Sequence, residues 1–357
     1  MNENKIGRRA AGFYCRPVSA GKRVFHLKNF MANEPNSEVL LEVRDLKTFF
    51  GGGDQTVYAV NGVSFKVRKG ETVALVGESG CGKSVTALSL ARLIPQPPGR
   101  FAGGEILYGG RDVLKMSDAE LRSLRGKEIS YVFQEPGESL NPVFTVGYQI
   151  GEAIRLHRKD VVLKEEVIRL MRLVGLPEPE RRMNAYPHEL SGGMQQRAMI
   201  AMALACHPSL LIADEPTTAL DVTIQAQIME LLGSLQAQLG MAVLLITHNL
   251  GLVADVAHWI NVMYAGRIVE SGPADDVLTR PSHPYTQGLL EAVPRLAGST
   301  GGRLKGIEGQ VPNPAHLPSG CAFHPRCPKA QARCRTDAPG WDSVGENHSV
   351  SCHFWKT

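Results

Sequence analysis

Hydrophobic side chains recur at every second position in two segments that open the regularly patterned part of this chain. The first is "EVLLEVRDL" (38–46) and the second is "VYAVNGVSFKVRKG" (57–70). A period of two is typical of β-strands, and the glycine run at 51–53 provides a turn between them. The pattern therefore predicts two strands joined by a short loop.

Three later segments are apolar throughout rather than alternating. They are "ETVALVG" (71–77), "LLIADEP" (210–216) and "AVLLITH" (242–248). Short, continuous apolar runs are typical of strands whose two faces are both covered, as in parallel sheets. Helical segments are predicted at about 85–94, 115–127, 147–174 and 222–239. This alternation of strands and helices predicts an α/β fold with parallel strands.

Changes in composition divide the chain into three parts. Residues 1–37 are polar and predict a disordered arm, either a misassigned extension with the true start near Met31 or a basic arm that contacts a partner or lipid. Residues 38–272 hold the regular pattern. Prolines punctuate residues 273–357, which predicts a small, loop-rich C-terminal extension.

The overall composition narrows the class of protein. The 357 residues carry a formal net charge of only +4, which gives no argument for nucleic-acid binding. The longest apolar run, 198–206, is too short to span a bilayer, and the N-terminal residues lack the apolar segment of a signal peptide. We therefore expect a cytosolic protein with reduced thiols that reaches a membrane only through a partner.

A glycine-rich segment, "GESGCGKS" (77–84), matches the phosphate-binding pattern G-x-x-x-x-G-K-[ST] in full. Its glycines allow backbone N–H groups to turn toward phosphate oxygens, and the following helix presents its positive end to the same oxygens. We expect Lys83 to reach the β- and γ-phosphates and Ser84 to bind Mg²⁺. The predicted ATP-binding residues of this loop are Gly77, Glu78, Ser79, Gly80, Cys81, Gly82, Lys83 and Ser84.

Two carboxylates end the apolar segment 210–216, at the strand end where ligands bind in open α/β sheets. Asp214 is placed to hold Mg²⁺, and Glu215 is expected to polarise the attacking water. His248 ends the next apolar segment and is expected to hydrogen-bond a γ-phosphate. The sequence thus predicts a hydrolytic site beside the phosphate loop.

A second glycine turn, "LSGGMQQR" (190–197), opens a helix with Ser191 as its cap. The chain already has a phosphate loop more than a hundred residues earlier. We therefore expect this turn to contact the nucleotide of another subunit. The residues concerned are Ser191, Gly192, Gly193 and Gln195.

Six short motifs follow one another in order. They are the phosphate loop, "YVFQEP" with Gln134, "LSGGMQQR", "LLIADEP", "TALD" (218–221) and "ITH". With this combination the region of about 39–272 resembles the nucleotide-binding subunit of ATP-binding cassette (ABC) transporters. The resemblance implies a RecA-like P-loop ATPase core with an antiparallel β subdomain and an α-helical subdomain at about 135–190. It also implies that two subunits pair head to tail around two ATP molecules.

The resemblance assigns roles to individual residues. It implies that Glu215 is the catalytic base and that His248 senses the γ-phosphate. It implies that Gln134 also senses the transmembrane partner. The implied Mg²⁺ ligands are Ser84, Gln134 and Asp214.

The resemblance also describes the dimer and the base-binding site. Ser191 and Gly193 are implied to contact the γ-phosphate of the opposite ATP, and Asp221 to lie at the dimer seam. Met194 departs from the family pattern, in which a Gln often follows Ser-Gly-Gly, and we expect little loss from it. Phe50 fits the adenine-stacking position best, and the alternatives are Phe49 and Tyr58.

The C-terminal extension indicates which branch of the family the chain resembles. It carries "RPSHPYTQGLLEAVP" (280–294) and four of the chain's seven cysteines. These features are similar to the C-terminal region of oligopeptide and dipeptide importer ATPases, a group that includes importers of nickel and other small solutes. The resemblance implies ATP-driven uptake of di- or oligopeptides, with nickel or another small solute as the alternative.

The four tail cysteines are spaced C-x5-C-x6-C-x17-C. Four thiols suit a tetrahedral zinc site or an iron–sulfur cluster, and the spacing matches neither the usual zinc pairs nor the ferredoxin patterns. The spacing therefore leaves zinc and iron–sulfur open. The family resemblance implies a [4Fe–4S] cluster bound by Cys321, Cys327, Cys334 and Cys352.

Importers of this kind imply further partners. These are a second ABC ATPase subunit, identical or different, two transmembrane permease subunits and an extracytoplasmic solute-binding protein. The chain is then expected to be a peripheral protein on the cytoplasmic face of the cell membrane. Cassette ATPases that act on nucleic acid or ribosomes are the other class, but they typically carry two cassettes or a long coiled-coil insertion, and we expect no nucleic-acid partner.

Overall fold

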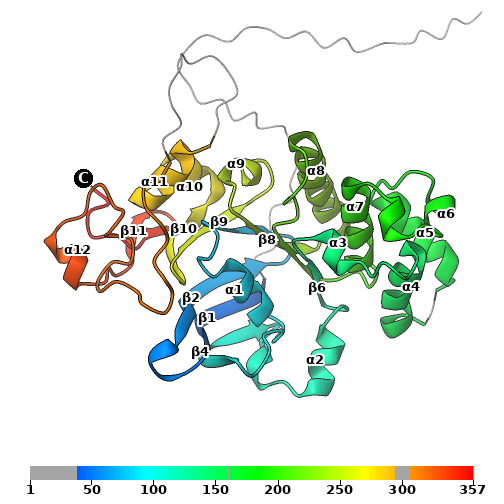
Figure 1. Ribbon diagram of the computed structural model, residues 1–357, viewed down its shortest axis with the longest axis horizontal. Helices are drawn as coiled ribbons and strands as arrows, with labels where there is room; N and C mark the ends of the chain where they lie inside the picture. The colour runs from blue at the N-terminus through cyan, green and yellow to red at the C-terminus, as the bar shows by residue number, and fades with distance from the viewer. Residues whose placement is uncertain (1–37, 160, 294–305, 357) are drawn as a thin grey trace, which may run out of the picture. The chain divides into compact units, whose positions relative to one another are not determined.

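An eight-stranded sheet forms the centre of the protein in the computed structural model, which describes residues 38–159, 161–293 and 306–356 (Figure 1). Its order is β11-β12-β10-β9-β3-β8-β7-β6, and the last five strands in this order run parallel. The three continuous apolar segments are β3, β7 and β8, so the prediction of buried parallel strands is confirmed. The parallel strands are β3 (Thr72–Val76), β6 (Ile129–Val132), β7 (Leu210–Asp214), β8 (Ala242–Thr247) and β9 (Trp259–Tyr264).

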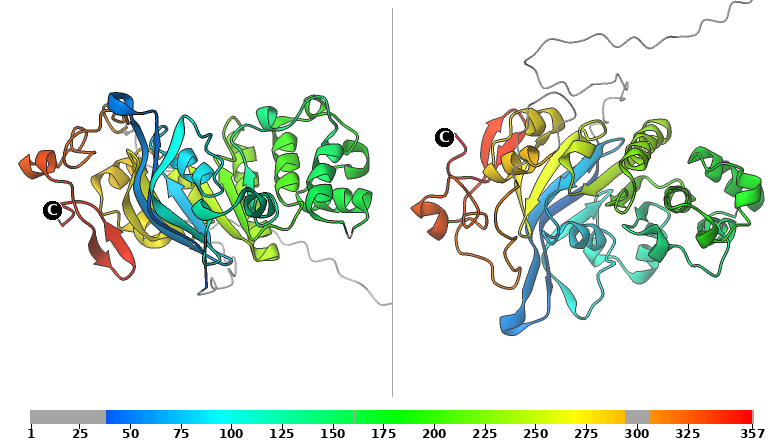
Figure 2. Two further views of the ribbon diagram at one scale, coloured as in Figure 1. Left: turned by 90° about the horizontal axis from the view of Figure 1, so that it is seen from below. Right: turned by 45° about the horizontal axis from the view of Figure 1, so that its top comes forward.

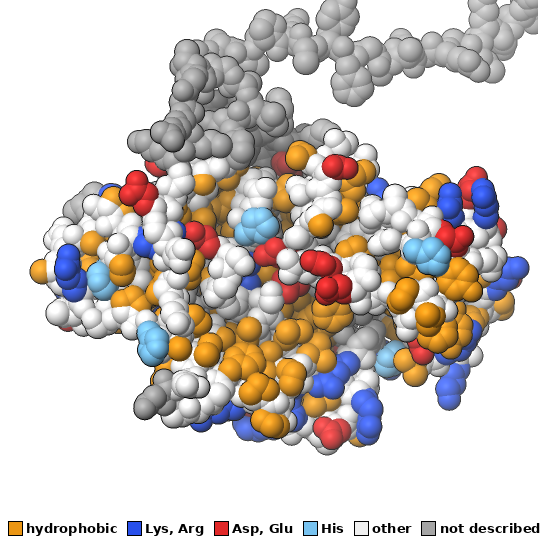
Figure 3. All heavy atoms as spheres, in the orientation of Figure 1, with side chains coloured by type: hydrophobic (Ala, Val, Ile, Leu, Met, Phe, Trp, Pro, Cys, Tyr) orange, Lys and Arg blue, Asp and Glu red, His pale blue; other side chains and the backbone are white. Residues whose placement is uncertain are grey.

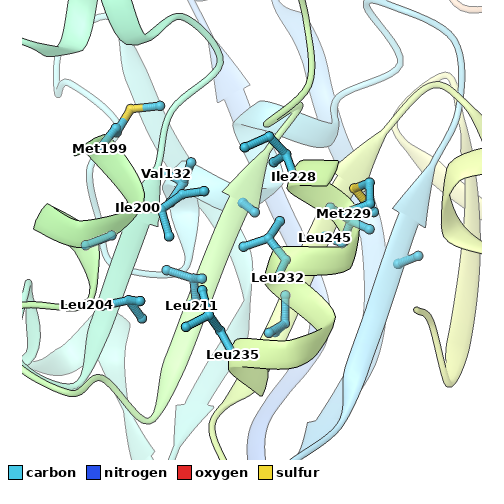
Figure 4. Packing of buried hydrophobic residues seen from close by; sticks show 14 of the residues in the cluster. Val132, Met199, Ile200, Leu204, Leu211, Ile228, Met229, Leu232, Leu235 and Leu245 are labelled. Carbon is cyan, nitrogen blue, oxygen red and sulfur yellow. The ribbon is translucent and has the colours of Figure 1, made fainter. Parts of the chain in front are cut away.

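Apolar residues occupy every position of the central strands because both faces of the sheet are covered. In β7, Leu211 and Ala213 face one hydrophobic cluster, whereas Leu210 and Ile212 face another. Helices α7 (Gly192–Ala203) and α8 (Val222–Leu239) cover the first face, where Ile200 and the α8 leucines meet β7 (Figure 4). The predicted helix 222–239 is therefore confirmed, with its bounds.

A four-stranded antiparallel sheet covers the other face. Its order is β2-β1-β4-β5, and its inward side chains share a cluster with β3, β7 and β8 (Figure 1). The two alternating segments form its first hairpin, as predicted. The strands are β1 (Val39–Phe50), β2 (Val57–Arg68), β4 (Gly99–Tyr108) and β5 (Arg111–Asp112).

The helices differ from the sequence prediction in three places. The helix predicted at about 85–94 begins earlier, at Lys83, and ends at Ser89. The expected helix 147–174 is wrong as a single element, because the chain leaves helical geometry at Arg158 and re-enters it after Val162. The two halves pack on each other where Gly151 lies against Leu163. The predicted helix 115–127 is shorter, since the Ser117–Glu120 capping box sets its start. These helices are α1 (Lys83–Ser89), α2 (Asp118–Leu124), α3 (Pro136–Ser139), α4 (Val146–His157), α5 (Leu163–Leu173) and α6 (Pro179–Arg182).

The C-terminal region extends the central sheet instead of standing beside it. Strand β12 (His348–Val350) pairs with β10 (Arg267–Pro273), and β11 (Asp342–Gly345) pairs with β12. Buried Glu270 accepts hydrogen bonds from the backbone N–H groups of Ser282 and His283 at 2.7 and 2.9 Å. The remaining helices are α9 (Leu250–Val253), α10 (Ala274–Thr279), α11 (Pro284–Glu291) and α12 (Ala332–Thr336).

The predicted arm, 1–37, lies outside the described residues. Within the residues that are described, none of the helices combines the length and the apolar character needed to traverse a lipid bilayer. The views in Figure 2 show the short helices α4–α6 grouped at one end of the central sheet, with the C-terminal strands at the other.

Candidate functional site

The predicted site residues converge because parallel strands end at the same edge of the sheet. Gln134 follows β6, Asp214 ends β7, His248 follows β8 and the phosphate loop follows β3. These four strands are neighbours in the order β3-β8-β7-β6. The structure therefore brings together at one edge motifs that are far apart in the sequence.

Two glycines of the phosphate loop are required by close backbone packing. A Cβ atom on Gly77 would lie 2.2 Å from the carbonyl oxygen of Met263, and one on Gly82 would lie 2.2 Å from that of Ala59. Gly82 also has a φ of 104°, in the left-handed region that favours glycine. The loop is thus pressed between β9 and β2, and its shape depends on both strands.

Lys83 points its ammonium group back into this loop. Its Nζ donates to the carbonyl oxygens of Gly77 at 2.8 Å and Glu78 at 3.0 Å, and lies 3.6 Å from a carboxylate oxygen of Glu215. The side chain is only 4% exposed, so this cation is held where phosphate oxygens are expected.

Asp214 and Ser84 provide the oxygen ligands that a Mg²⁺ site needs. The Ser84 side chain lies near the Asp214 carboxylate and acts to lower the pKa of that carboxyl. Burial raises the pKa of the Asp214 carboxyl, and its Oδ1 atom is buried with no hydrogen-bond partner among the described residues. A buried carboxylate oxygen without a donor fits a cation ligand, so these residues fit the implied Mg²⁺.

Glu215 lies between the groups expected to act on the γ-phosphate. Its Oε2 atom lies 3.1 Å from His248 Nδ1 and accepts a hydrogen bond from the Thr218 hydroxyl at 3.1 Å. The residue has a φ of 45°, a conformation rarely adopted by residues other than glycine. Backbone strain of this kind clusters at functional sites.

The other residues of the phosphate loop lie between β3 and α1. Glu78, Ser79 and Gly80 follow Gly77 directly after β3. Cys81 is fully buried, and burial raises the pKa of its thiol to about 11. This thiol is therefore a structural side chain, and the loop uses the backbone at this position.

The second glycine turn does not join the phosphate loop. Ser191 caps α7 by accepting a hydrogen bond from the Met194 N–H at 3.4 Å, and the turn is exposed. Within the described part of the chain, no hydrogen bond or ion pair links Ser191, Gly192 or Gly193 to residues 77–84. The Gln195 side chain donates to the carbonyl oxygens of Pro187 and Leu190 instead. Asp221, before α8, is likewise exposed.

The aromatic residues near the base-binding region separate into two groups. Phe49 and Tyr58 pack edge to face with ring centroids 4.7 Å apart. The Phe50 ring lies instead beside Gly99, 3.2 Å from the position of an ideal Cβ atom there. The assignment of Phe50 to adenine stacking stays a prediction.

Two residues of the C-terminal region contact the phosphate loop, and the sequence reasoning missed both. The Tyr285 hydroxyl accepts a hydrogen bond from the Glu78 N–H at 2.8 Å. Arg326 donates two hydrogen bonds to the Glu78 carboxylate. The sequence signal for the Tyr285 contact was the "HPY" motif. In the structure Tyr285 is fully buried, and the His283 side chain caps α11. Burial lowers the pKa of His283 to about 4.

The four tail cysteines line one small cavity. They are all free thiols, and burial raises the pKa of the Cys321 thiol to about 11. Nevertheless, the described residues contain no group of three or more His, Cys, Asp or Glu side chains that could hold a metal ion. The donor set suits zinc or an iron–sulfur cluster, but the arrangement does not confirm either. The cavity is lined by Cys321, Cys327, Cys334 and Cys352, among others.

Comparison with known proteins identifies the family. Residues 60–218 match the family model described as "ABC transporter", and residues 269–334 match "Oligopeptide/dipeptide transporter, C-terminal region". A probable peptide ABC transporter ATP-binding protein from Sinorhizobium fredii is 48% identical, and the match covers 92% of this chain and 98% of that protein. The chain belongs to the ATP-binding subunits of ABC transporters. It is therefore an ATP-hydrolysing subunit, and the predicted P-loop ATPase fold is confirmed.

Other members of the ABC transporter family support the same assignment. The dipeptide transport ATP-binding protein DppD of Escherichia coli is 48% identical over 88% of this chain and 96% of its own length. The ATP-binding cassette MJ0796, solved as a dimer in a post-hydrolysis state bound to ADP and phosphate, aligns with a TM-score of 0.59 and 26% identity. That match covers 66% of this chain and 98% of the cassette.

The geometry predicts that Glu215→Gln retains ATP but loses turnover. Glutamine keeps the shape and an acceptor for Thr218, but it cannot take a proton from water, so we expect ATP hydrolysis to fall about 100-fold or more while ATP affinity changes little. Steady-state phosphate release and nucleotide binding in the assembled transporter measure the two effects. Glu165→Gln, at an exposed position on α5, is the control. Turnover at the normal rate would remove Glu215 from its assigned role.

Proposed function

We propose that this chain energises the uptake of di- or oligopeptides across the cytoplasmic membrane. The observation that carries the proposal is the complete phosphate site combined with a C-terminal region of the oligopeptide/dipeptide transporter type. Relatives named for peptide transport or peptide import match along nearly their whole length. In this proposal, residues 38–272 form the ATPase domain and 273–357 the importer-type extension.

In this proposal, ATP hydrolysis is carried out by the residues that meet at the phosphate loop. Lys83 and the loop N–H groups bind the phosphates, and Glu215 accepts a proton from the attacking water while His248 orients the γ-phosphate. Asp214, Ser84 and Gln134 would hold Mg²⁺, which neutralises charge on the phosphate oxygens. Support comes from the orphaned Asp214 oxygen and the contact between Glu215 and His248.

A second ATPase subunit completes this site. The exposed Ser191 turn is too far from its own phosphate loop to share a hydrogen bond with it, so it is free to contact the nucleotide of a partner. Asp221 is exposed beside it and would lie at the seam. The dimeric state of the related cassette supports this arrangement.

The helical subdomain offers a docking surface for a transmembrane permease. Four large apolar side chains are exposed from the end of β6 to the first turn of α4: Phe133, Val143, Phe144 and Tyr148. The rings of Phe144 and Tyr148 stack at 4.8 Å. Orange side chains gather over this region in Figure 3, and exposed apolar groups of this size favour a protein contact. Binding to two permeases would place the chain at the cytoplasmic face, opposite an external solute-binding protein.

We further propose that the tail cysteines bind a [4Fe–4S] cluster, with Zn²⁺ as the alternative. The shared cavity of the four thiols supports the proposal. Four thiolates would cross-link a region with little core of its own.

Peptide uptake is testable in proteoliposomes that contain this chain, its second ATPase subunit, both permeases and the solute-binding protein. We expect ATP-dependent accumulation of labelled di- or oligopeptides that stops when Lys83 is replaced by Ala. Accumulation of nickel but not of peptides would overturn the peptide assignment and leave the ATPase assignment intact.

Ser191→Arg should act on the neighbouring site rather than its own. A large cation at the α7 cap blocks the approach of the turn to the partner's nucleotide, so we expect hydrolysis at the partner's phosphate site to fall at least tenfold. Hydrolysis at the two sites is measured separately by inactivating one site at a time. Glu215→Gln inactivates the site of this chain, and the equivalent change inactivates the site of the second ATPase subunit. Equal loss at both sites would contradict the composite site.

The cluster predicts about four irons and four sulfides per chain after anaerobic purification. Cys334→Ser should remove most of the iron because the cluster needs all four thiolates. Cys206→Ser, outside the cavity, should leave the iron content unchanged. Protein that contains one zinc and no sulfide would refute the cluster.

A further inference from the structure

The phosphate loop contains a carboxylate that phosphate binding does not need. Glu78 lies directly after Gly77, in a loop whose purpose is to hold a highly charged anion. A free negative charge here would repel the triphosphate. The Glu78 backbone N–H is also unavailable to phosphate, because it donates to the Tyr285 hydroxyl at 2.8 Å.

Arg326 compensates this charge from the C-terminal region. Its Nη1 and Nη2 atoms donate to the two carboxylate oxygens of Glu78 at 2.7 and 2.9 Å, a two-point contact between residues 248 positions apart. The arginine side chain is only 4% exposed. A guanidinium buried to this degree is destabilising unless a carboxylate pairs with it. The planar guanidinium binds the Glu78 carboxylate at two points and so fixes its orientation.

The position of Arg326 is itself determined by its surroundings. Its Nε atom donates to the Glu308 carbonyl oxygen at 2.9 Å, and Nη2 also donates to that of Ile307 at 3.2 Å. The guanidinium lies 5.9 Å from the centre of the Tyr264 ring. Arg326 therefore connects the backbone at 307–308 and the Tyr264 ring to the loop.

Buried aromatic rings support the same contact. The Tyr264 and Tyr285 rings lie 4.7 Å apart, and Phe323 packs on both at 5.1 and 5.3 Å. Tyr264 ends β9, and two residues later the Gly266 N–H donates to the carbonyl oxygen of Cys81 at 2.9 Å. The phosphate loop is thus held at Glu78 by the C-terminal region and at Cys81 by the core sheet.

We propose that Arg326 is a positioning residue of the ATP site. It neutralises Glu78 and fixes the first turn of the phosphate loop, so the C-terminal region sets the affinity for ATP. This role concerns the ATPase activity and does not depend on which solute is transported. Arg326 does not touch the phosphates and acts through Glu78.

The test compares Arg326→Gln, Glu78→Gln and the double variant in the assembled transporter. We expect Arg326→Gln to raise the Kd for a fluorescent ATP analogue and the KM for ATP about tenfold, while kcat at saturating ATP changes less than about twofold. The double variant should recover to within about threefold of the wild type, because the uncompensated carboxylate is gone. Arg333→Gln is the matched control, since Arg333 is an exposed arginine of the same region that pairs with Asp337.

Two results would overturn the proposal. One is a folded Arg326→Gln variant with unchanged ATP affinity. The other is a double variant that binds ATP as poorly as the single one, which would make Arg326 a support of the C-terminal region alone. Arg326→Lys covers the case in which the glutamine variant fails to fold. It keeps the charge but loses the two-point contact, so we expect a loss of about threefold, and unchanged affinity would again overturn the proposal.

Discussion

The close packing of the phosphate loop against its neighbours is the constraint on which the site depends. At Gly77 and Gly82 the backbone carbonyl oxygens of β9 and β2 approach so closely that no side chain fits. Glycine at these positions allows the backbone to turn N–H groups toward an anion. The apolar sheet beneath the loop keeps these strands in place, because its two faces are each covered by a hydrophobic cluster. The hydrophobic core thus holds the strands that give the loop its triphosphate-binding shape.

The C-terminal region belongs to this arrangement as well. Strand β12 continues the sheet that carries the loop, and buried Glu270 receives donors from Ser282, His283 and His348. Since a buried carboxylate with several donors is costly to disrupt, the region is attached firmly to the core. Its contacts with Glu78 are consequently made by a fixed surface and not by a loose tail.

The local elements and the motifs could be predicted from the sequence. The buried strands could be predicted because continuous apolar runs have few other uses, and the phosphate loop because its glycines and Lys83 occur together. The break after His157 was not predicted, since both halves of 147–174 have helical periodicity and the packing of Gly151 on Leu163 is visible only in the structure. The Glu78–Arg326 contact was also missed. No local pattern connects two charged residues 248 positions apart.

The contact expected of the Ser191 turn is not made within a single chain. Its sequence predicts phosphate contact, yet in a single chain it lies apart from the loop, as the proposed two-subunit site requires. The most direct measurement is therefore the ATP turnover of the purified chain alone against the same chain in the assembled transporter. We expect the isolated chain to bind ATP but to hydrolyse it at a small fraction of the assembled rate. Equal turnover by chains shown to be monomeric would contradict it.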